Sequence, residues 1–429
     1  MTVSFYTLGC KLNFAETATI GRLFAESGYT RVAFGDPADV VVVNSCTVTA
    51  QADKKCRQAI HKAVKTSPHA AVAVVGCFAE LKADDIRRIP GVTLVLGNHD
   101  KFRIVERLRE VIRDPHEEEC GIQDTSSFIP AYSLFDRTRS FLKVQDGCDY
   151  QCAYCTVPKA RGHSRNAPVA KVVALARDIA AQGIREVALT GVNIGDFGRS
   201  TGENFLQLLT ALNAVDGLER IRTGSVEPNL LTEAIVELTA RSAKLAPHFH
   251  IPLQSGCNRI LALMARRYRR ELFAEKLALI RRYIPHAAVG ADVIVGFPGE
   301  TGEDFADTAS FIEGLDLSYL HVFVYSERPN TKAAEMHGKV PRHIAEQRSK
   351  ILIDLSNSKR MQFYRRHIGE TLDVLFERRE KDGVMTGFTG NYIKTETPCD
   401  NTLIGRCIPM TITDVNAAGN ATCVRSCRI

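Results

Sequence analysis

The sequence predicts an α/β protein with an N-terminal doubly wound parallel sheet, a central partial (β/α)6 barrel and a small C-terminal all-β barrel. Three observations predict this fold class. Strand and helix patterns alternate over the first part of the chain, six more strand–helix units follow, and the tail shows short strand patterns separated by turn signals. A length of 429 residues suits two or three domains of about 150 residues each.

The composition is that of an ordinary globular protein and excludes bulk disorder. Hydrophobic residues make up 45% of the chain and charged residues 24%. The net charge of +6 permits a nucleic-acid partner without requiring one. No apolar run reaches the ~18 residues that a membrane span needs, and the first ten residues lack the pattern of a signal peptide. We therefore expect a cytoplasmic protein without a membrane partner.

The N-terminal part, residues 1–113, carries three cysteines at related positions. The predicted strands are residues 3–8, 40–44, 71–75 and 92–96, and the predicted helices are residues 15–27 and 51–65. Cys10, Cys46 and Cys77 each follow one of the first three strands. Because parallel strands end at one edge of a sheet, these three thiols are expected to meet there.

A polar segment, residues 114–137, reads as a linker, and the central part is expected over residues 138–366. The six predicted strands are residues 140–145, 186–190, 220–226, 247–253, 288–295 and 319–325. Predicted helices include residues 169–181, 230–239 and 271–283. The tail, residues 367–429, shows strand patterns at residues 372–376, 384–389, 391–396 and 406–415.

A second cysteine group, with the spacing C-x3-C-x2-C, follows the first strand of the central part. Cys148, Cys152 and Cys155 can hold three irons of a [4Fe–4S] cluster and leave the fourth iron open to a chelating molecule. The alternative is a structural zinc site, but such sites use four protein ligands, and only His163 lies near enough in sequence to supply the fourth. We favour the cluster, since three thiolates suffice to hold it, whereas a structural zinc site would need a fourth protein ligand.

This spacing, with Tyr154 just before the last cysteine, resembles the radical S-adenosylmethionine (SAM) superfamily. The resemblance implies that SAM chelates the open iron through its amino and carboxylate groups. An electron from the cluster then cleaves SAM to methionine and a 5′-deoxyadenosyl radical, which abstracts hydrogen from an unactivated C–H bond. The protein orients the cofactor and excludes water.

Both cysteine groups together resemble the methylthiotransferase family. The matching segments are TLGCKLNFAET (7–17), VVNSCTVTAQAD (42–53) and VVGCFAE (74–80), together with a tail that resembles a TRAM domain. The resemblance implies that Cys10, Cys46 and Cys77 hold a second, auxiliary [4Fe–4S] cluster whose sulfur ligand is inserted into the substrate. One SAM methylates that sulfur, a second yields the radical, and CH3–S couples to carbon. Both clusters must then face one cavity.

Further segments at strand ends match the family and suggest cofactor contacts. The candidates for binding SAM are Tyr154, Gly191, Asn193, Glu227, Gln254 and Asp292, with Ser255 as a second-tier contact. Each has an ordinary alternative. Gly191 and Asn193 also suit a plain strand–helix turn, and Glu227 suits a charge at a helix N-terminus.

The motifs G-C-K-L-N (9–13) and G-V-N-I-G (191–195) look most like the group that acts on N6-threonylcarbamoyladenosine at position 37 of tRNA, where the product carries CH3–S on C2. The threonylcarbamoyl carboxylate calls for a cation, and the candidates are Arg161, Arg165, Arg266 and Arg267. Alternatives in the same family are isopentenyladenosine-37 of tRNA and an aspartate of a ribosomal protein. A non-catalytic iron–sulfur protein that binds tRNA is the alternative from another class.

The expected partners are the anticodon stem-loop of tRNA, a reductant protein and a sulfur source. Basic residues near Arg266 and Arg270 could contact phosphates, and Phe388 and Tyr392 could stack on bases, although core packing suits these two rings better. The seven remaining cysteines are expected to be inert thiols: Cys56, Cys120, Cys257, Cys399, Cys407, Cys423 and Cys427.

Overall fold

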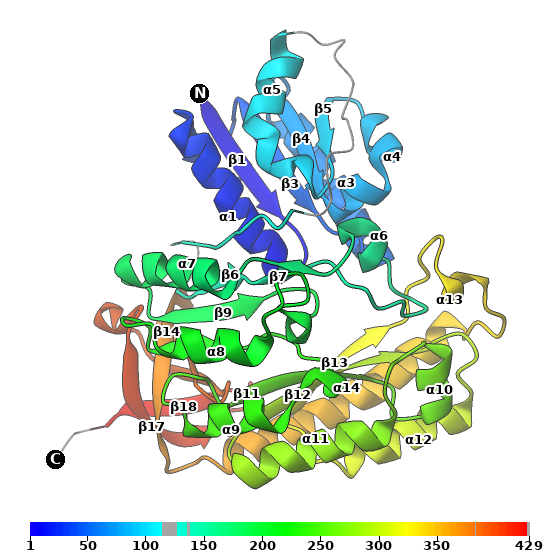
Figure 1. Cartoon of the computed structure of the whole chain (residues 1–429), viewed down its shortest axis with the longest axis vertical. Helices are drawn as coiled ribbons and strands as arrows, with labels where there is room; N and C mark the ends of the chain where they lie inside the picture. The colour runs from blue at the N-terminus through cyan, green and yellow to red at the C-terminus, as the bar shows by residue number, and fades with distance from the viewer. Residues whose placement is uncertain (114–126, 135–137, 382, 427–429) are drawn as a thin grey trace.

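The computed structural model describes residues 1–113, 127–134, 138–381 and 383–426. It has the three parts that the sequence predicts, with the N-terminal sheet at one end, the central barrel in the middle and the tail barrel beside it (Figure 1). Most of the predicted linker, Cys120 and Cys427 lie outside the described residues.

The N-terminal part is a five-stranded parallel sheet with the strand order β2-β1-β3-β4-β5. The strands are β1 (Thr2–Thr7), β2 (Thr30–Val32), β3 (Val40–Ser45), β4 (Ala71–Gly76) and β5 (Val92–Leu96). The helices are α1 (Lys11–Glu26), α2 (Ala50–Thr66), α3 (Cys77–Leu81), α4 (Ala83–Arg87), η1 (Asp100–Arg103) and α5 (Ile104–Arg113). Every residue of β3 is buried, as expected for a valine-rich strand covered on both faces.

The central part is an open barrel of six parallel strands. Its strands are β6 (Ser140–Lys143), β9 (Glu186–Thr190), β10 (Arg220–Arg222), β11 (His248–Gln254), β12 (Ala288–Val295) and β13 (Tyr319–Val324). They form two three-stranded sheets, which two isolated bridges join between Ile221 and Leu245 and between Ser225 and His250. The predicted strand 220–226 is therefore shorter than expected, because only Ser225 pairs beyond Arg222.

Helices cover the outer face of this barrel and enclose the largest apolar core. The longer helices are α7 (Val169–Ala181), α8 (Phe205–Asn213), α9 (Glu233–Arg241), α11 (Arg270–Tyr283), α12 (Gly302–Glu313) and α14 (Arg342–Arg365). Short elements complete the part: β7 (Gln145–Asp146), α6 (Val157–Arg161), β8 (Arg165–Asn166), η2 (Ile194–Asp196), η3 (Pro228–Leu230), α10 (Asn258–Leu263) and α13 (Lys332–Glu335).

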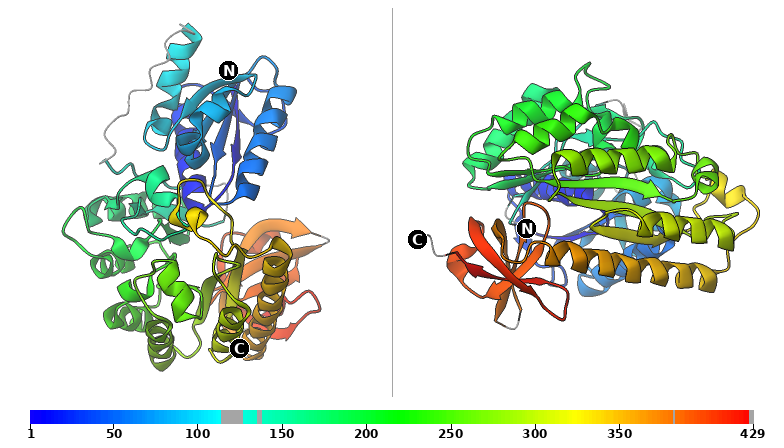
Figure 2. Two further views of the ribbon diagram at one scale, coloured as in Figure 1. Left: turned by 90° about the vertical axis from the view of Figure 1, so that its right-hand side faces the viewer. Right: turned by 90° about the horizontal axis from the view of Figure 1, so that it is seen from below.

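The tail is a closed five-stranded barrel with the order β14-β15-β16-β18-β17. Its elements are β14 (Thr371–Lys381), β15 (Val384–Thr389), β16 (Lys394–Pro398), η4 (Asn401–Leu403), β17 (Cys407–Val415) and β18 (Ala421–Arg425). The predicted strand 391–396 begins later, at Lys394, because Asn391 and Tyr392 form a turn in which Tyr392 has a φ of 66°. Figure 2 shows the tail barrel packed beside the central strands and α14.

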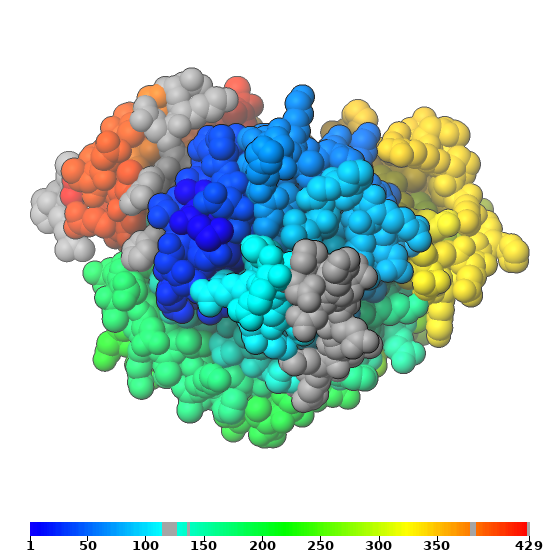
Figure 3. All heavy atoms as spheres, turned by 90° about the horizontal axis from the view of Figure 1, so that it is seen from above, coloured from blue at the N-terminus to red at the C-terminus, as the bar shows by residue number. Residues whose placement is uncertain are grey.

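The N-terminal sheet sits over the central barrel with its carboxyl edge toward it. The arrow of β1 points at the central part in Figure 1, and Figure 3 shows the N-terminal part covering that end of the molecule. Helix α1 makes the contact: the rings of Phe14 and Phe141 lie 6.4 Å apart, and Ala15 packs with Ala131 and Ala188.

No helix in the described part of the chain combines the length and apolar character of a membrane crossing.

Candidate functional site

The cysteines of the central part lie in a loop that begins directly after β7. Gly147 opens this loop with a φ of 70°, and a Cβ there would lie 1.9 Å from the carbonyl oxygen of His163, so only glycine fits. Each sulfur accepts a hydrogen bond. The Tyr150 N–H donates to Cys148 and the Val157 N–H to Cys155, each at 3.4 Å, and Arg266 Nη1 donates to Cys152 at 3.0 Å.

These donors suit bound thiolates, since hydrogen bonds to ligand sulfurs orient them and offset their charge. Burial raises the pKa of Cys148 to about 11 and that of Cys155 to about 12, and the charge of Cys152 adds to both shifts. Free thiolates are therefore unfavourable here without a metal, which would displace the thiol protons on binding.

The structure does not favour the zinc alternative. The side chain of His163 is almost fully exposed, and its Nδ1 pairs with Asp149 Oδ1 at 2.8 Å. His163 is therefore engaged outside the cysteine group, and three thiols with an open fourth position fit a [4Fe–4S] cluster better than a structural zinc ion.

The N-terminal cysteines follow β1, β3 and β4, as the sequence predicts, and meet at the carboxyl edge of the sheet. Gly9 has a φ of 102°, and a Cβ there would lie 2.9 Å from Cys46 Sγ, so the Gly9–Cys10 turn lies directly against Cys46. Burial raises the pKa of Cys46 to about 12, with contributions from Cys10 and Cys77. The Asn98 amide reaches Cys77 Sγ at 3.6 Å. Three converging thiols at one edge fit a second cluster.

A buried ionic network, which the sequence did not predict, lies between the two cysteine groups. Its carboxylates are Glu16 and Asp146, and its cations are Lys101, Lys143, Arg161 and Arg165. Burial alone would raise the pKa of Glu16, but Arg161, Lys101 and Lys143 outweigh it and hold the pKa below its ordinary value. Four cations against two carboxylates leave positive charge beside Cys10 and Cys77, which suits an anionic iron–sulfur cluster.

The candidate contacts for SAM lie at the carboxyl ends of the central strands, and Asn193 fits the role best. Its side chain is buried, yet neither its Oδ1 nor its Nδ2 has a hydrogen-bond partner among the described residues. A buried amide without partners is unfavourable unless a ligand supplies them. Gly191 differs from the expectation, because its close neighbours are Gln145 and Ile194 of the chain itself.

Two further candidates sit at the ends of β10 and β11. Glu227 forms an ion pair with Arg266, whose Nη1 also lies 3.4 Å from the Tyr154 hydroxyl. Burial raises the pKa of Glu227 despite that pair. Gln254 adopts a φ of 64°, an uncommon conformation for a residue other than glycine. Ser255 is fully buried and bonded to Thr308, so it supports the loop and does not face the cavity.

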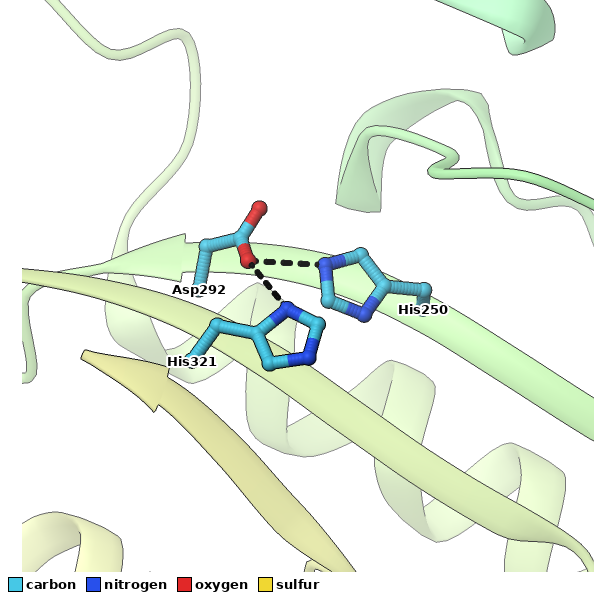
Figure 4. A group of neighbouring side chains, drawn as sticks. All are labelled: His250, Asp292 and His321. Carbon is cyan, nitrogen blue, oxygen red and sulfur yellow. Dashed lines mark ion pairs between the residues drawn. The ribbon is translucent and has the colours of Figure 1, made fainter. Parts of the chain in front are cut away.

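Asp292 belongs to a cluster with His250 and His321 on three adjacent strands. Asp292 Oδ1 lies 2.9 Å from His250 Nε2 and 3.3 Å from His321 Nδ1, and the three side chains point toward one another on the inner face of the barrel (Figure 4). Burial alone would raise the pKa of Asp292, but hydrogen bonds from both histidines hold it well below its ordinary value.

One cavity of about 260 Å³ borders both parts of the protein. Its lining includes Val48 and Thr49 of the N-terminal part, Tyr154 and Cys155 of the cysteine loop, and Gln254, Asp292 and Phe323 of the barrel strands. Cys155 therefore lines this cavity directly, and Cys46 of the other cysteine group precedes the lining residue Val48 by two positions. Arg328 fixes the arrangement by bonding Thr47 and Asp53 across the interface, each at 2.7 Å.

Cys10 and Lys11 lie where α1 begins, and both residues are exposed. Desolvation, together with the charges of Arg139 and Arg222, lowers the pKa of Lys11 to about 8. The residues that follow in α1, Phe14 and Ala15, pack against β6 and β9, so the start of this helix lies beside the barrel.

The four arginines predicted to bind the substrate carboxylate are mostly engaged elsewhere, and this corrects the sequence-based expectation. Arg161 and Arg165 are buried in the ionic network, and Arg266 holds Glu227 and Cys152. Only Arg267 is exposed, and its guanidinium lies 3.9 Å from the centre of the Tyr150 ring. Sequence reasoning missed this because all the carboxylate partners except Asp146 are distant in sequence.

Phe388 and Tyr392 are mainly packing residues, as expected. Their rings stack 5.0 Å apart, Arg139 lies over Phe388, and Arg222 lies over Tyr392.

Among the other cysteines, Cys56 was expected to be an inert thiol, and the structure gives it a positioning contact. Its sulfur accepts from the N–H of Cys46 at 3.4 Å and donates to the carbonyl of Cys46 at 3.3 Å. Cys56 therefore holds the backbone of a triad cysteine.

Comparison with known proteins agrees with this arrangement. Residues 142–312 match the radical SAM superfamily and residues 2–97 match the uncharacterized protein family UPF0004. The solved structure of TsrM, a radical SAM methyltransferase from Kitasatospora setae, has a TM-score of 0.58 and 14% identity, covering 99% of this chain and 85% of TsrM. That likeness concerns the fold alone. The fold and the cysteine loop define a radical SAM enzyme, a class that uses a [4Fe–4S] cluster and SAM.

Relatives narrow the class. The threonylcarbamoyladenosine tRNA methylthiotransferase MtaB of Bacillus subtilis (strain 168) is 38% identical, covering 96% of this chain and 93% of the relative. MtaB of Aquifex aeolicus (strain VF5) is also 38% identical, over 87% of this chain and 92% of its own. A tRNA-2-methylthio-N(6)-dimethylallyladenosine synthase of Acidothermus cellulolyticus is 33% identical, over 88% and 78%. The chain belongs to the methylthiotransferase family of radical SAM enzymes.

Proposed function

We propose that this enzyme transfers a methylthio group to C2 of N6-threonylcarbamoyladenosine at position 37 of tRNA. The observation that carries the proposal is that each of the two docked parts carries three cysteines after its strands, and that residues of both parts line one cavity. Relatives named for threonylcarbamoyladenosine reach 38% identity, and those named for dimethylallyladenosine reach 34%. This difference supports the first substrate.

Each cysteine group has a separate task in this proposal. Cys148, Cys152 and Cys155 hold the cluster that binds SAM, and Cys10, Cys46 and Cys77 hold the auxiliary cluster that carries the transferred sulfur. When bound, the first cluster and SAM together supply the radical that removes hydrogen from C2. Such chemistry is required because C2 of adenine offers no nucleophile to an ordinary methyltransferase.

The chain's own residues bind and orient the reactants. The unpartnered Asn193 amide is placed to bond SAM, and Glu227, held by Arg266, is placed to accept from a ribose hydroxyl. Asp292 keeps a carboxylate at the cavity wall in a fixed orientation between two histidines. Residues of both the N-terminal part and the barrel form the wall of the cavity. A reductant protein and a sulfur source complete the set of partners.

The test offers anaerobically prepared enzyme three substrates in parallel: tRNA with threonylcarbamoyladenosine, tRNA with isopentenyladenosine, and the ribosomal protein. Mass spectrometry of the digested nucleosides or peptides measures each product. We expect the methylthio product from the first tRNA in clear excess. A clear preference for either other substrate contradicts the substrate assignment and leaves the radical chemistry standing, whereas 5′-deoxyadenosine without any methylthio product contradicts methylthiolation.

A further inference from the structure

Lys11 is an exposed cation next to one of the proposed cluster ligands. It is the first residue of α1 and follows Cys10 directly. Packing of Phe14 and Ala15 against β6 and β9 fixes the start of this helix over the inner face of the barrel. Glu186, Arg139, Arg222 and, from β11, His248 lie near enough to Lys11 for their charges to influence one another.

No carboxylate of the described chain neutralises Lys11. Among the described residues, none lies within ion-pair distance of its ammonium group. Glu186 is the acidic neighbour, but it is buried and already paired with Arg139, Arg220 and Arg222. Arg139 also pairs with Glu377. This group of side chains thus holds four cations, the three arginines and Lys11, but only two carboxylates, Glu186 and Glu377. Of the four cations, Lys11 is the one that is exposed.

The shape of the substrate places an anion near this cation. In adenine, C2 and the carbon that bears N6 both flank N1, so they lie on the same edge of the base. If C2 faces the sulfur beside Cys10, the group on N6 leaves the base on the side of the N-terminal part. A threonylcarbamoyl group carries its carboxylate on that substituent, whereas an isopentenyl group is uncharged.

Resting on the function proposed above, we propose that Lys11 binds the carboxylate of the threonylcarbamoyl group and thereby selects this substrate over isopentenyladenosine. Three of the four arginines first considered for this role are unsuitable, because Arg161, Arg165 and Arg266 are each held by carboxylates of the chain. The fourth, Arg267, lies over the Tyr150 ring and donates to the carbonyl oxygen of Asp149, away from Cys10 in sequence. An isopentenyl group leaves the Lys11 ammonium group without an anionic partner, and a binding group left unpaired in this way discriminates between substrates.

The experiment compares wild-type enzyme with Lys11→Met and Lys11→Arg, and with Lys171→Met as the matched control. Lys171 is an exposed lysine on α7, on the outer side of the barrel. Three anticodon stem-loop RNAs are used: one with threonylcarbamoyladenosine, one with its carboxylate converted to the primary amide, and one with isopentenyladenosine. The readouts are kcat/KM for the methylthio product, together with iron content and 5′-deoxyadenosine formation, which report cluster integrity.

We expect Lys11→Met to lose about 10- to 100-fold in kcat/KM on the carboxylate RNA and to change little on the amide RNA. For wild-type enzyme, kcat/KM should be lower by a similar factor on the amide RNA than on the carboxylate RNA. Lys11→Arg should retain most activity, and Lys171→Met should equal wild type.

If Lys11→Met loses kcat/KM equally on the carboxylate and amide RNAs, the inference is overturned. It is also overturned if wild-type enzyme has the same kcat/KM on both RNAs. This second comparison uses only wild-type enzyme, so it remains valid even if the Lys11 variants lose iron. If wild-type enzyme modifies only the isopentenyladenosine RNA, the proposed substrate itself is contradicted. That outcome is seen with unmutated enzyme, so it can be distinguished from a failure of the Lys11 inference.

Discussion

Glu186 shows at the scale of one residue how the tail is attached to the barrel. It is buried at the start of β9 and pairs with Arg139, Arg220 and Arg222. Two of these arginines also bond the tail, since Arg220 donates to the carbonyls of Phe388 and Asp373, and Arg222 to those of Thr389 and Gly390. Removing the carboxylate therefore leaves Arg220 and Arg222 buried without a carboxylate partner, whereas Arg139 keeps Glu377.

We predict that Glu186→Gln destabilises the protein by about 3–5 kcal/mol at pH 7, because it leaves buried charges unpaired. Burial alone would raise the pKa of Glu186, but Arg222, Arg139 and Arg220 lower it to about 2. The ionised Glu186 carboxylate therefore stabilises the folded protein at pH values above about 4.3, the pKa of glutamate in the unfolded chain. This stabilisation is lost as the pH falls from about 4.3 toward about 2. The variant should therefore lose less stability than wild type between those pH values.

Urea unfolding at pH 7, 4 and 3 measures both effects. The matched control is Glu237→Gln, which removes an exposed pair with Arg241 and should change stability by no more than about 1 kcal/mol. Parallel acid profiles for wild type and Glu186→Gln, or a cost below about 1 kcal/mol at pH 7, would show that this network does not hold the tail.

The elements that meet between the barrel and the tail leave a cavity of about 350 Å³. Its lining includes Tyr319 of β13, Arg360 of α14, and Phe388, Tyr392 and Lys394 of the tail. Aromatic rings and cations together are the groups that nucleic acids contact. The tail also contacts the barrel through the arginines that pair with Glu186. Deleting the tail would therefore expose these buried groups as well as remove an RNA contact, so point substitutions are the cleaner test.

We predict that Lys394→Ala weakens tRNA binding about 3- to 10-fold and lowers the slope of log affinity against log salt by about 1, as expected for one lost phosphate contact. Filter binding or fluorescence anisotropy at several salt concentrations measures both. Lys171→Ala, which changes an exposed lysine of α7 that does not line this cavity, should leave affinity and slope unchanged. An unchanged slope for Lys394→Ala would mean that tRNA does not contact this cavity.

Local patterns allowed much of the molecule to be predicted from its sequence. Both cysteine groups follow predicted strands, so the edges on which they gather could be inferred from strand polarity alone. The network of Glu16, Asp146 and Arg161 could not be predicted, because it forms only when α1 docks on the barrel and joins residues more than a hundred positions apart. The same docking buries Arg161, whereas Lys11 stays exposed.

At the scale of the whole molecule, the account requires two clusters with separate tasks facing one substrate. The most direct measurement follows two products in one anaerobic reaction, 5′-deoxyadenosine and the methylthio nucleoside, for wild type, Cys148→Ala and Cys10→Ala. Cys423→Ala, in the tail barrel, is the control. Wild type and the control should carry about eight irons and form both products, and each triad variant about four irons.

The predicted result is that Cys148→Ala forms neither product, whereas Cys10→Ala still forms 5′-deoxyadenosine but no methylthio nucleoside. Loss of cofactor cleavage to the same extent in both variants, each shown to be folded, would contradict the separation of tasks, and a wild-type protein that never exceeds about four irons would contradict the second cluster.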